Sequence, residues 1–219
     1  MSKGKLIVLE GPDGCGKSTH VSRLARWFDT LGLSNTWTTS EPYATHIGDL
    51  IKKCMTQEIL RTPSWAAMAL LFAADRMEHC KTIGDALEEG RFVICDRYYL
   101  SSIIYQCAWG NILNTLHSQE AVKWVREINK YAIKPDLTII LNAPAQTLKE
   151  RLLQRETPKT IYDNDQLHNE VIEAYKHAED YLPDEAIVYV DASYDKEVTH
   201  IRICHAVSKF FGLTDKLLG

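Results

Sequence analysis

A chain of 219 residues with 45% hydrophobic and 25% charged residues is typical of a soluble globular protein with one sizeable core. Its formal net charge of −4 argues against a general basic surface, so we expect no nucleic-acid partner. We find no signal-peptide pattern and no apolar run near transmembrane length, and the six cysteines show no metal-like spacing. The sequence therefore predicts a cytoplasmic protein with reduced thiols and no membrane contact.

Short apolar runs alternate with helical patterns along the chain. The runs predict strands at residues 5–10, 35–39, 92–96, 137–141 and 187–191. The intervening spacing predicts helices at residues 19–31, 65–84, 118–131, 145–154, 165–181 and 197–211. This alternation predicts an α/β fold in one domain spanning residues 1–219, a mostly parallel five-stranded sheet with helices on both faces. Ligands of such sheets bind at the carboxyl ends of the strands.

The first predicted strand runs into a phosphate-binding loop. The motif is Gly11-Pro12-Asp13-Gly14-Cys15-Gly16-Lys17-Ser18, a full match to G-x-x-x-x-G-K-[ST], and Thr19 continues into a helical pattern. Strand, glycine loop and helix aim backbone N–H groups at a polyphosphate. Lys17 would reach the β- and γ-phosphates, and the Ser18 hydroxyl would ligate Mg²⁺. The motif predicts a binding site for a nucleoside triphosphate.

Two later motifs fit the same chemistry. The strand at residues 92–96 ends in Asp96, where a carboxylate would lie beside the magnesium, and Arg97 follows, able to fork onto a phosphate. A strand-end salt bridge is the alternative interpretation. In the helix at 65–84, Phe72 and Arg76 share one face and could hold a flat base. Core packing for Phe72 and a surface position for Arg76 would explain the same spacing.

Taken together, the ordered motifs resemble those of thymidylate (dTMP) kinases, members of the P-loop nucleoside-monophosphate kinase group. The similarity extends from residue 5 to about residue 211. It rests on the loop preceded by Glu10, on Glu41-Pro42, on Leu71-Phe72-Ala73-Ala74-Asp75-Arg76, and on the run from Asp96-Arg97 to Tyr105-Gln106. The resemblance implies a P-loop kinase that phosphorylates dTMP to dTDP with ATP and Mg²⁺.

The resemblance also implies a role for individual residues of the acceptor site. Phe72 would stack on thymine, Arg76 would bond the edge of the base, and Arg97 would hold the dTMP phosphate. Ser102 and Gln106 would lie near the base, and Tyr105 would exclude a ribose 2′-hydroxyl. Asp13 would meet the 3′-hydroxyl, and Glu41 would belong to the same substrate site. Relatives often carry an arginine beside the Glu-Pro pair, but here Ser40 precedes it and no arginine follows up to His46.

Because the phosphate loop contains no arginine, we expect a lid at about residues 151–163 to supply a cation. Arg155 is the favoured catalytic cation, with Arg151 as the other candidate. An ordinary solvated basic turn is the alternative interpretation of this segment. Cys15, next to a helix N-terminus and Lys17, predicts either a thiol of lowered pKa shielded by ATP or a small residue that only fills the loop.

Two other classes of function can be compared with the kinase hypothesis. A regulatory GTPase is disfavoured because the nearest match to its guanine motif, Asn129-Lys130-Tyr131-Ala132, lacks the aspartate. A deoxynucleoside kinase, or a kinase for another deoxynucleoside monophosphate, stays open, and Glu41 is the available base for a nucleoside hydroxyl. The resemblance implies a homodimer packed through helices, and the apolar residues 65–70 fit either that interface or the core.

Overall fold

One parallel sheet organises the chain in a computed structural model that describes residues 3–59, 63–111, 113, 118–154 and 160–213. The strands pair in the order β2-β3-β1-β4-β5. Their bounds are β1 Lys5–Glu10, β2 Thr36–Ser40, β3 Phe92–Asp96, β4 Leu137–Asn142 and β5 Ile187–Asp191. The five-stranded parallel sheet predicted from the sequence is confirmed, and β2 starts and ends one residue later than expected.

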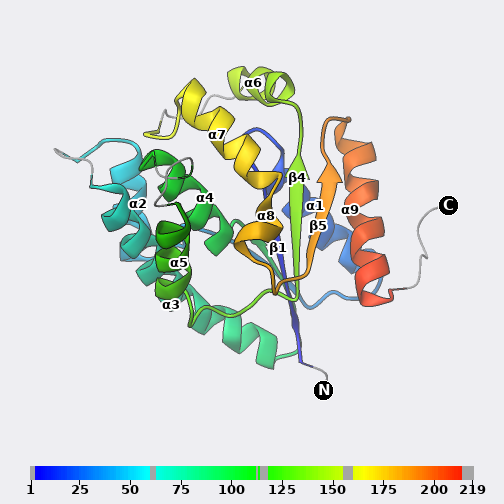
Figure 1. The fold of residues 1–219 in the computed structure, drawn as a ribbon. Helices are drawn as coiled ribbons and strands as arrows, with labels where there is room; N and C mark the ends of the chain where they lie inside the picture. The colour runs from blue at the N-terminus through cyan, green and yellow to red at the C-terminus, as the bar shows by residue number, and fades with distance from the viewer. Residues whose placement is uncertain (1–2, 60–62, 112, 114–117, 155–159, 214–219) are drawn as a thin grey trace.

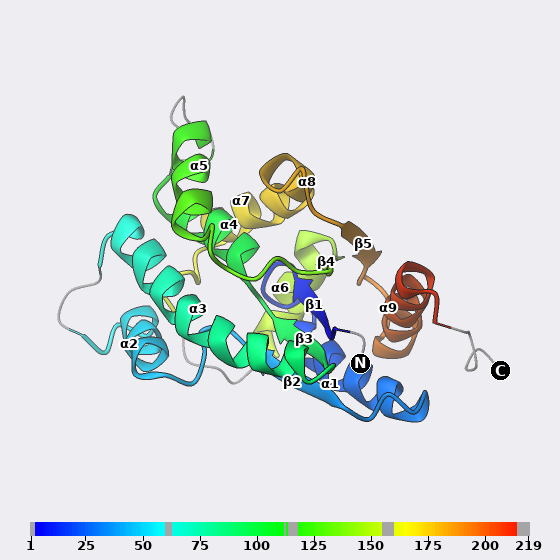
Figure 2. The same ribbon diagram turned by 90° about the horizontal axis from the view of Figure 1, so that it is seen from below.

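Helices cover both faces of this sheet (Figure 1). Their bounds are α1 Lys17–Thr30, α2 His46–Met55, α3 Trp65–Glu88, α4 Tyr99–Trp109, α5 Ser118–Ile128, α6 Ala145–Leu153, α7 Asp165–Tyr175, α8 Ala178–Tyr181 and α9 Lys196–Phe211. Figure 2 shows α1 and α9 on one side of the strands, and α3, α4 and α5 on the other. None of the described helices combines the length and apolarity needed to cross a membrane.

Alternation along β1 shows how the sequence fills two cores. Leu6 and Val8 belong to the cluster that α3, α4 and α7 cover, whereas Ile7 and Leu9 belong to the cluster under α1 and α9. All four side chains are at most 1% exposed, because a central strand of a parallel sheet is buried on both faces. An uninterrupted apolar run is therefore the correct signal for this strand.

The helix prediction for residues 165–181 is wrong in one respect, because the helix breaks between α7 and α8. At His177 the backbone leaves helical geometry, with φ −121° and ψ 35°. The amide of Ala178 donates to the Tyr189 hydroxyl at 3.1 Å rather than to a carbonyl one turn earlier. Tyr189 lies on β5, so a tertiary contact ends this helix.

Two helices, α2 and α4, were not predicted as such. Most of α4 is buried, so it lacks the one-sided apolar stripe by which a surface helix is recognised. The ten-residue α2 begins at the N-cap Thr45, whose hydroxyl accepts from the amide of Gly48 at 2.9 Å. Both helices border the site described next.

Candidate active site

The glycine loop between β1 and α1 has the backbone that its sequence requires. Gly11, Gly14 and Gly16 have φ values of 141°, 87° and 97°, in a region that side chains disfavour. A Cβ on Gly14 would lie 2.8 Å from the carbonyl oxygen of Leu148, so the close approach also requires glycine. Gly16 is the N-cap of α1, which therefore presents its first amides to the loop.

Lys17 is folded into this loop. Its Nζ lies 2.9 Å from the carbonyl oxygens of both Gly11 and Pro12, and the residue is only 6% exposed. Next to it, the Ser18 hydroxyl donates to Oδ2 of Asp96 at 2.5 Å. The contact follows from sheet register, since Leu9 of β1 pairs with Asp96 of β3. A cavity of about 250 Å³ opens over this loop and is lined by Asp13, Gly14, Gly16, Lys17, Ser18, Ser40, Glu41, Asp96 and Arg97.

A second cavity of about 200 Å³ adjoins the first. Its lining includes all eight of the substrate residues predicted from the sequence: Asp13, Glu41, Phe72, Arg76, Arg97, Ser102, Tyr105 and Gln106. Asp13, Glu41 and Arg97 line both cavities. The sequence motifs, spread over almost one hundred positions, are thus brought to one place at the carboxyl ends of β1, β2 and β3.

Arg97 connects the two cavities. Its guanidinium forms an ion pair with Asp13 at 2.5 Å and donates to the hydroxyls of Ser101 at 3.0 Å and Tyr105 at 3.2 Å. Burial opposes ionisation of Asp13, but the charges of Arg97 and Lys17 hold the pKa of that carboxyl below its usual value. Arg97 itself has φ 68°, unusual for an arginine and often found at functional sites. Its salt bridge is therefore part of the cavity wall.

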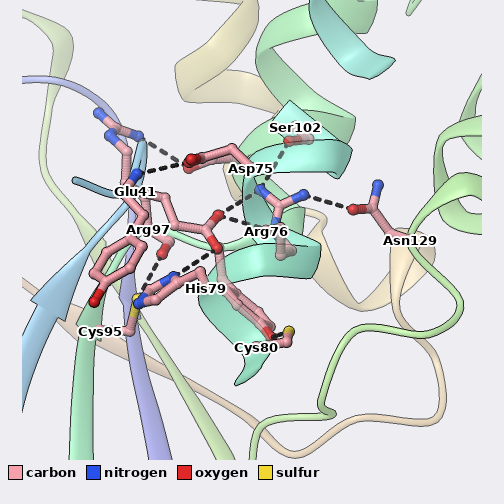
Figure 3. A network of polar contacts seen from close by, with 12 residues as sticks. Glu41, Asp75, Arg76, His79, Cys80, Cys95, Arg97, Ser102 and Asn129 are labelled. Carbon is pink, nitrogen blue, oxygen red and sulfur yellow. Dashed lines mark hydrogen bonds and ion pairs between the residues drawn. The ribbon is translucent and has the colours of Figure 1, made fainter. Parts of the chain in front are cut away.

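A buried network holds Arg76 at the back of the second cavity (Figure 3). Arg76 is 1% exposed, so the surface position considered above is wrong. Its Nε donates to Glu41 at 2.8 Å, and its two terminal nitrogens reach Asn129 at 2.5 Å and Ser102 at 3.1 Å. Burial opposes the charge, but Glu41 raises the pKa of Arg76 and keeps it ionised. Figure 3 shows His79 on the other oxygen of Glu41, where its Nδ1 lies 3.2 Å away.

Gln106 leaves one hydrogen-bonding atom available in this cavity. Its amide nitrogen donates to the Tyr162 hydroxyl at 2.9 Å, and the residue is 1% exposed. Its oxygen Oε1 is buried and has no partner among the residues that the structure describes. A buried acceptor without a donor is costly, so this atom marks a position for an N–H or O–H of a ligand.

The expectation of an activated thiol at Cys15 is wrong. Its side chain is 1% exposed, and burial raises the pKa of the thiol although Lys17 and Arg97 lower it. The Lys17 ammonium lies 3.6 Å from Sγ but does not compensate for the loss of solvent. Cys15 fills the space behind the loop, as the alternative interpretation predicted.

Comparison with known proteins agrees with this arrangement. The protein-family model described as thymidylate kinase matches residues 9–203 of the chain. The chain belongs to the thymidylate kinase family. A probable thymidylate kinase of Pyrococcus horikoshii is 38% identical over 190 residues, which cover 85% of this chain and 88% of the relative. A thymidylate kinase of Caldicellulosiruptor saccharolyticus is 37% identical over 176 residues, covering 80% and 82% of the two chains.

A solved structure extends the comparison to the fold. Thymidylate kinase from Candida albicans superimposes with a TM-score of 0.79 at 27% sequence identity, covering 97% of this chain and 92% of the other. The predicted P-loop kinase fold is thereby confirmed. The protein is a thymidylate-kinase-type phosphotransferase, with a phosphate group as acceptor.

Some site residues were missed in the sequence, and one predicted residue lies outside the described residues. Asn129 and His79 hold the Arg76–Glu41 pair, and Tyr162 holds Gln106. Asn129 contacts Arg76 across 53 positions of the chain, and Tyr162 contacts Gln106 across 56, so only the folded structure identifies these two residues. Arg155 lies outside the residues described. Arg151, the other candidate lid cation, donates to the carbonyl oxygens of Ala192 at 2.8 Å and Tyr194 at 3.0 Å, which ties α6 to the loop after β5.

Proposed function

We propose that this chain transfers the γ-phosphate of ATP to dTMP, giving dTDP and ADP. The observation that carries this proposal is the pair of adjoining cavities that share Asp13, Glu41 and Arg97. One cavity has the loop and lysine suited to a polyphosphate, and the other has a ring and an amide suited to a base. Their meeting point is where donor and acceptor phosphates would approach each other.

The acceptor cavity has groups complementary to a thymine nucleotide. Phe72 is half-buried in its wall, so one face of the ring is available for stacking on a pyrimidine. The unpartnered oxygen of Gln106 could accept from the ring N–H of thymine. Arg97, already paired with one carboxylate, could transfer its fork of donors to the dTMP phosphate. These contacts support dTMP as the acceptor.

The transfer itself needs positioning and charge neutralisation. An ionised oxygen of the dTMP phosphate would attack the γ-phosphorus, forming one P–O bond while the bond to the leaving ADP oxygen breaks. No proton has to be removed from the acceptor, so no general base is required. Lys17 would leave the carbonyls of Gly11 and Pro12 for the phosphates, and the α1 amides would bind the donor.

The residues beside the loop fit a magnesium ion. The Ser18 hydroxyl and an Asp96 carboxylate oxygen lie 2.5 Å apart, and Mg²⁺ prefers such oxygen ligands together with substrate phosphates and water. No cluster of three or more acidic, histidine or cysteine ligands occurs among the described residues, which suits an ion held largely by the nucleotide. When bound, the ion would offset negative charge on the donor phosphates.

The proposed activity can be tested with purified protein by separating nucleotides after incubation. ATP, dTMP and MgCl₂ together should yield dTDP and ADP in equal amounts, and EDTA should stop the reaction. Omitting dTMP is the control for simple ATP hydrolysis. ADP without dTDP would contradict the proposed acceptor.

Tyr105 is proposed to exclude ribonucleotides by the volume of its ring. Its hydroxyl also donates to Asp13 at 3.0 Å, so ring and hydroxyl must be tested separately. Tyr105→Ala should reduce the preference for dTMP over ribo-TMP, measured as a ratio of kcat/KM, by about 10-fold. Tyr105→Phe keeps the ring and should retain the preference. An unchanged ratio in Tyr105→Ala would exclude a steric role.

We further propose a lid at about residues 151–163 within one kinase domain of residues 1–219, with Arg155 as its catalytic cation. Leu152 and Thr160, described residues within the proposed lid, both line the acceptor cavity, which supports a lid near this site. Arg155→Ala should lower kcat by about 100-fold while changing either KM much less. Arg151→Ala should lower the melting temperature instead, because its contacts are structural. Wild-type kcat in Arg155→Ala would remove the lid cation from the mechanism.

The alternative that the sequence left open, a nucleoside kinase, would need Glu41 as the base for a neutral hydroxyl. However, one oxygen of Glu41 accepts from Arg76 and the other faces His79. These contacts give Glu41 a positioning role.

We also propose a homodimer, since Leu50 of α2 and Leu70 of α3 are 42% and 50% exposed. A sedimentation experiment on wild-type protein and Leu70→Glu tests this.

A further inference from the structure

A third cavity, of about 400 Å³, lies away from the phosphate loop. Tyr99 of α4 and Asn129, which follows α5, contribute to its wall. Lys134 and Glu185 contribute from just before the amino ends of β4 and β5, whereas the phosphate loop follows the carboxyl end of β1. The cavity therefore opens toward the opposite end of the sheet from the two cavities already described.

Cationic side chains outnumber acidic ones in the lining of this cavity, four to three. Lys123 and Arg126 line it, and within the part of the chain that the structure describes neither forms an ion pair or hydrogen bond. Lys134 donates to the backbone carbonyl of Asp184, not to a carboxylate. Lys130, by contrast, is paired with Glu127 at 2.6 Å. Lys123 and Arg126 are thus available to a multiply charged anion, and the Lys134 ammonium keeps donors beyond the one that it uses.

Glu185 adds a hydrogen-bond acceptor to the same wall. The Tyr99 hydroxyl donates to its Oε1 at 2.5 Å. Oε2 is buried and has no partner among the described residues. Burial raises the pKa of this carboxyl even though Lys134 and Arg126 lower it. A buried carboxylate oxygen requires a donor, and a ligand that reaches it must carry a hydroxyl or an N–H.

We propose that this cavity is a second ligand site, which binds the phosphate monoester of a hydroxylated small molecule such as a sugar phosphate. The phosphate would be held by Arg126, Lys123 and Lys134, and a hydroxyl would donate to Oε2 of Glu185. A volume of about 400 Å³ accommodates a ligand of this size. A free phosphate ion would satisfy the cations but leave Glu185 without a donor.

One hydrogen bond connects this site with the acceptor cavity. Asn129 lines the third cavity, and its Oδ1 accepts from a terminal nitrogen of Arg76 at 2.5 Å. Arg76 lines the acceptor cavity and pairs with Glu41. A ligand that moves Asn129 would therefore change the position of Arg76, and occupancy should alter the KM for dTMP. The expected change in the KM for dTMP rests on the proposed function, whereas binding of the ligand to the third cavity does not.

Titration calorimetry of the full chain with ribose 5-phosphate tests the site, with saturating dTMP present to occupy the acceptor cavity. Saturable binding should be seen, weakened about 10-fold or more in Arg126→Ala, as expected for loss of a charge-assisted hydrogen bond. Arg26→Ala, an equal change of charge on exposed α1, should bind as the wild type does. Inorganic phosphate should bind more weakly than the sugar phosphate.

Several results would overturn the proposal. They are absence of binding, equal affinity in Arg126→Ala and wild type, or inorganic phosphate binding as tightly as ribose 5-phosphate. In dTMP kinetics, ribose 5-phosphate should shift the KM of the wild type but not of Arg126→Ala, whose activity without the effector should be unchanged. Binding without any shift in KM would contradict the coupling through Asn129. If dTMP is not a substrate, calorimetric titration with ribose 5-phosphate in the absence of dTMP still tests the site.

Discussion

Lys17→Ala should lower kcat for transfer from ATP to dTMP by about 1000-fold, the largest effect expected from any single substitution in this chain. The ammonium is the only described side-chain cation contributed by the phosphate loop itself, and it is buried against the carbonyls of Gly11 and Pro12. Its loss would leave the charge of the transferring phosphoryl group uncompensated. Rates are measured by dTDP formation at saturating nucleotides.

Two controls make this result interpretable. Lys81→Ala removes an equal charge from an exposed position on α3, so it should retain wild-type activity. A thermal melt of Lys17→Ala should show a folded protein, because the lysine contributes no apolar core contact. A folded Lys17→Ala protein with near-normal turnover would show that the loop does not bind the donor phosphates.

Arg97→Ala should reduce kcat/KM for dTMP by about 100-fold, with a smaller effect on the KM for ATP. The guanidinium is the cation that both cavities share, and no arginine follows Glu41-Pro42 up to His46 to replace it. The substitution also leaves the Asp13 carboxylate without its ion pair and adds repulsion toward the acceptor phosphate.

Arg97→Lys separates charge from geometry. It keeps the positive charge but lacks the two-pronged donor, so it should recover only part of the lost kcat/KM. Asp13→Asn removes the partner carboxylate while retaining its size. If Arg97→Ala raised the KM for ATP and left that for dTMP unchanged, Arg97 would belong to the donor site instead.

The sequence predicted the parts of this site that follow from local chemistry. Lys17 and Ser18 are defined by the spacing of the loop glycines, and Asp96 follows from its place at the end of an apolar strand. Family resemblance pointed to Phe72 and Arg97 as acceptor-site residues, and both line one cavity. These residues lie together because each motif is short and parallel strands bring their carboxyl ends together, whereas their roles stay predictions.

What the sequence did not show depends on burial and long-range contact. The sequence left two interpretations of Cys15 open, because the burial that raises the pKa of its thiol cannot be read from its neighbours in the chain. Asn129 and Arg76 are 53 positions apart, and only packing of α3 against α5 makes them partners. In the same way, Tyr189 on β5 ends a helix whose own residues favour its continuation.

A competition between acceptors tests the central claim most directly. Purified protein with Mg-ATP is given dTMP, isotopically labelled thymidine and dCMP in equal amounts, and phosphorylated products are separated over time. The two adjoining cavities predict dTDP as the main product, because dTMP presents both a thymine to Phe72 and Gln106 and an anionic phosphate to Arg97. Formation of dTMP from thymidine, or of dCDP in preference to dTDP, would contradict this account.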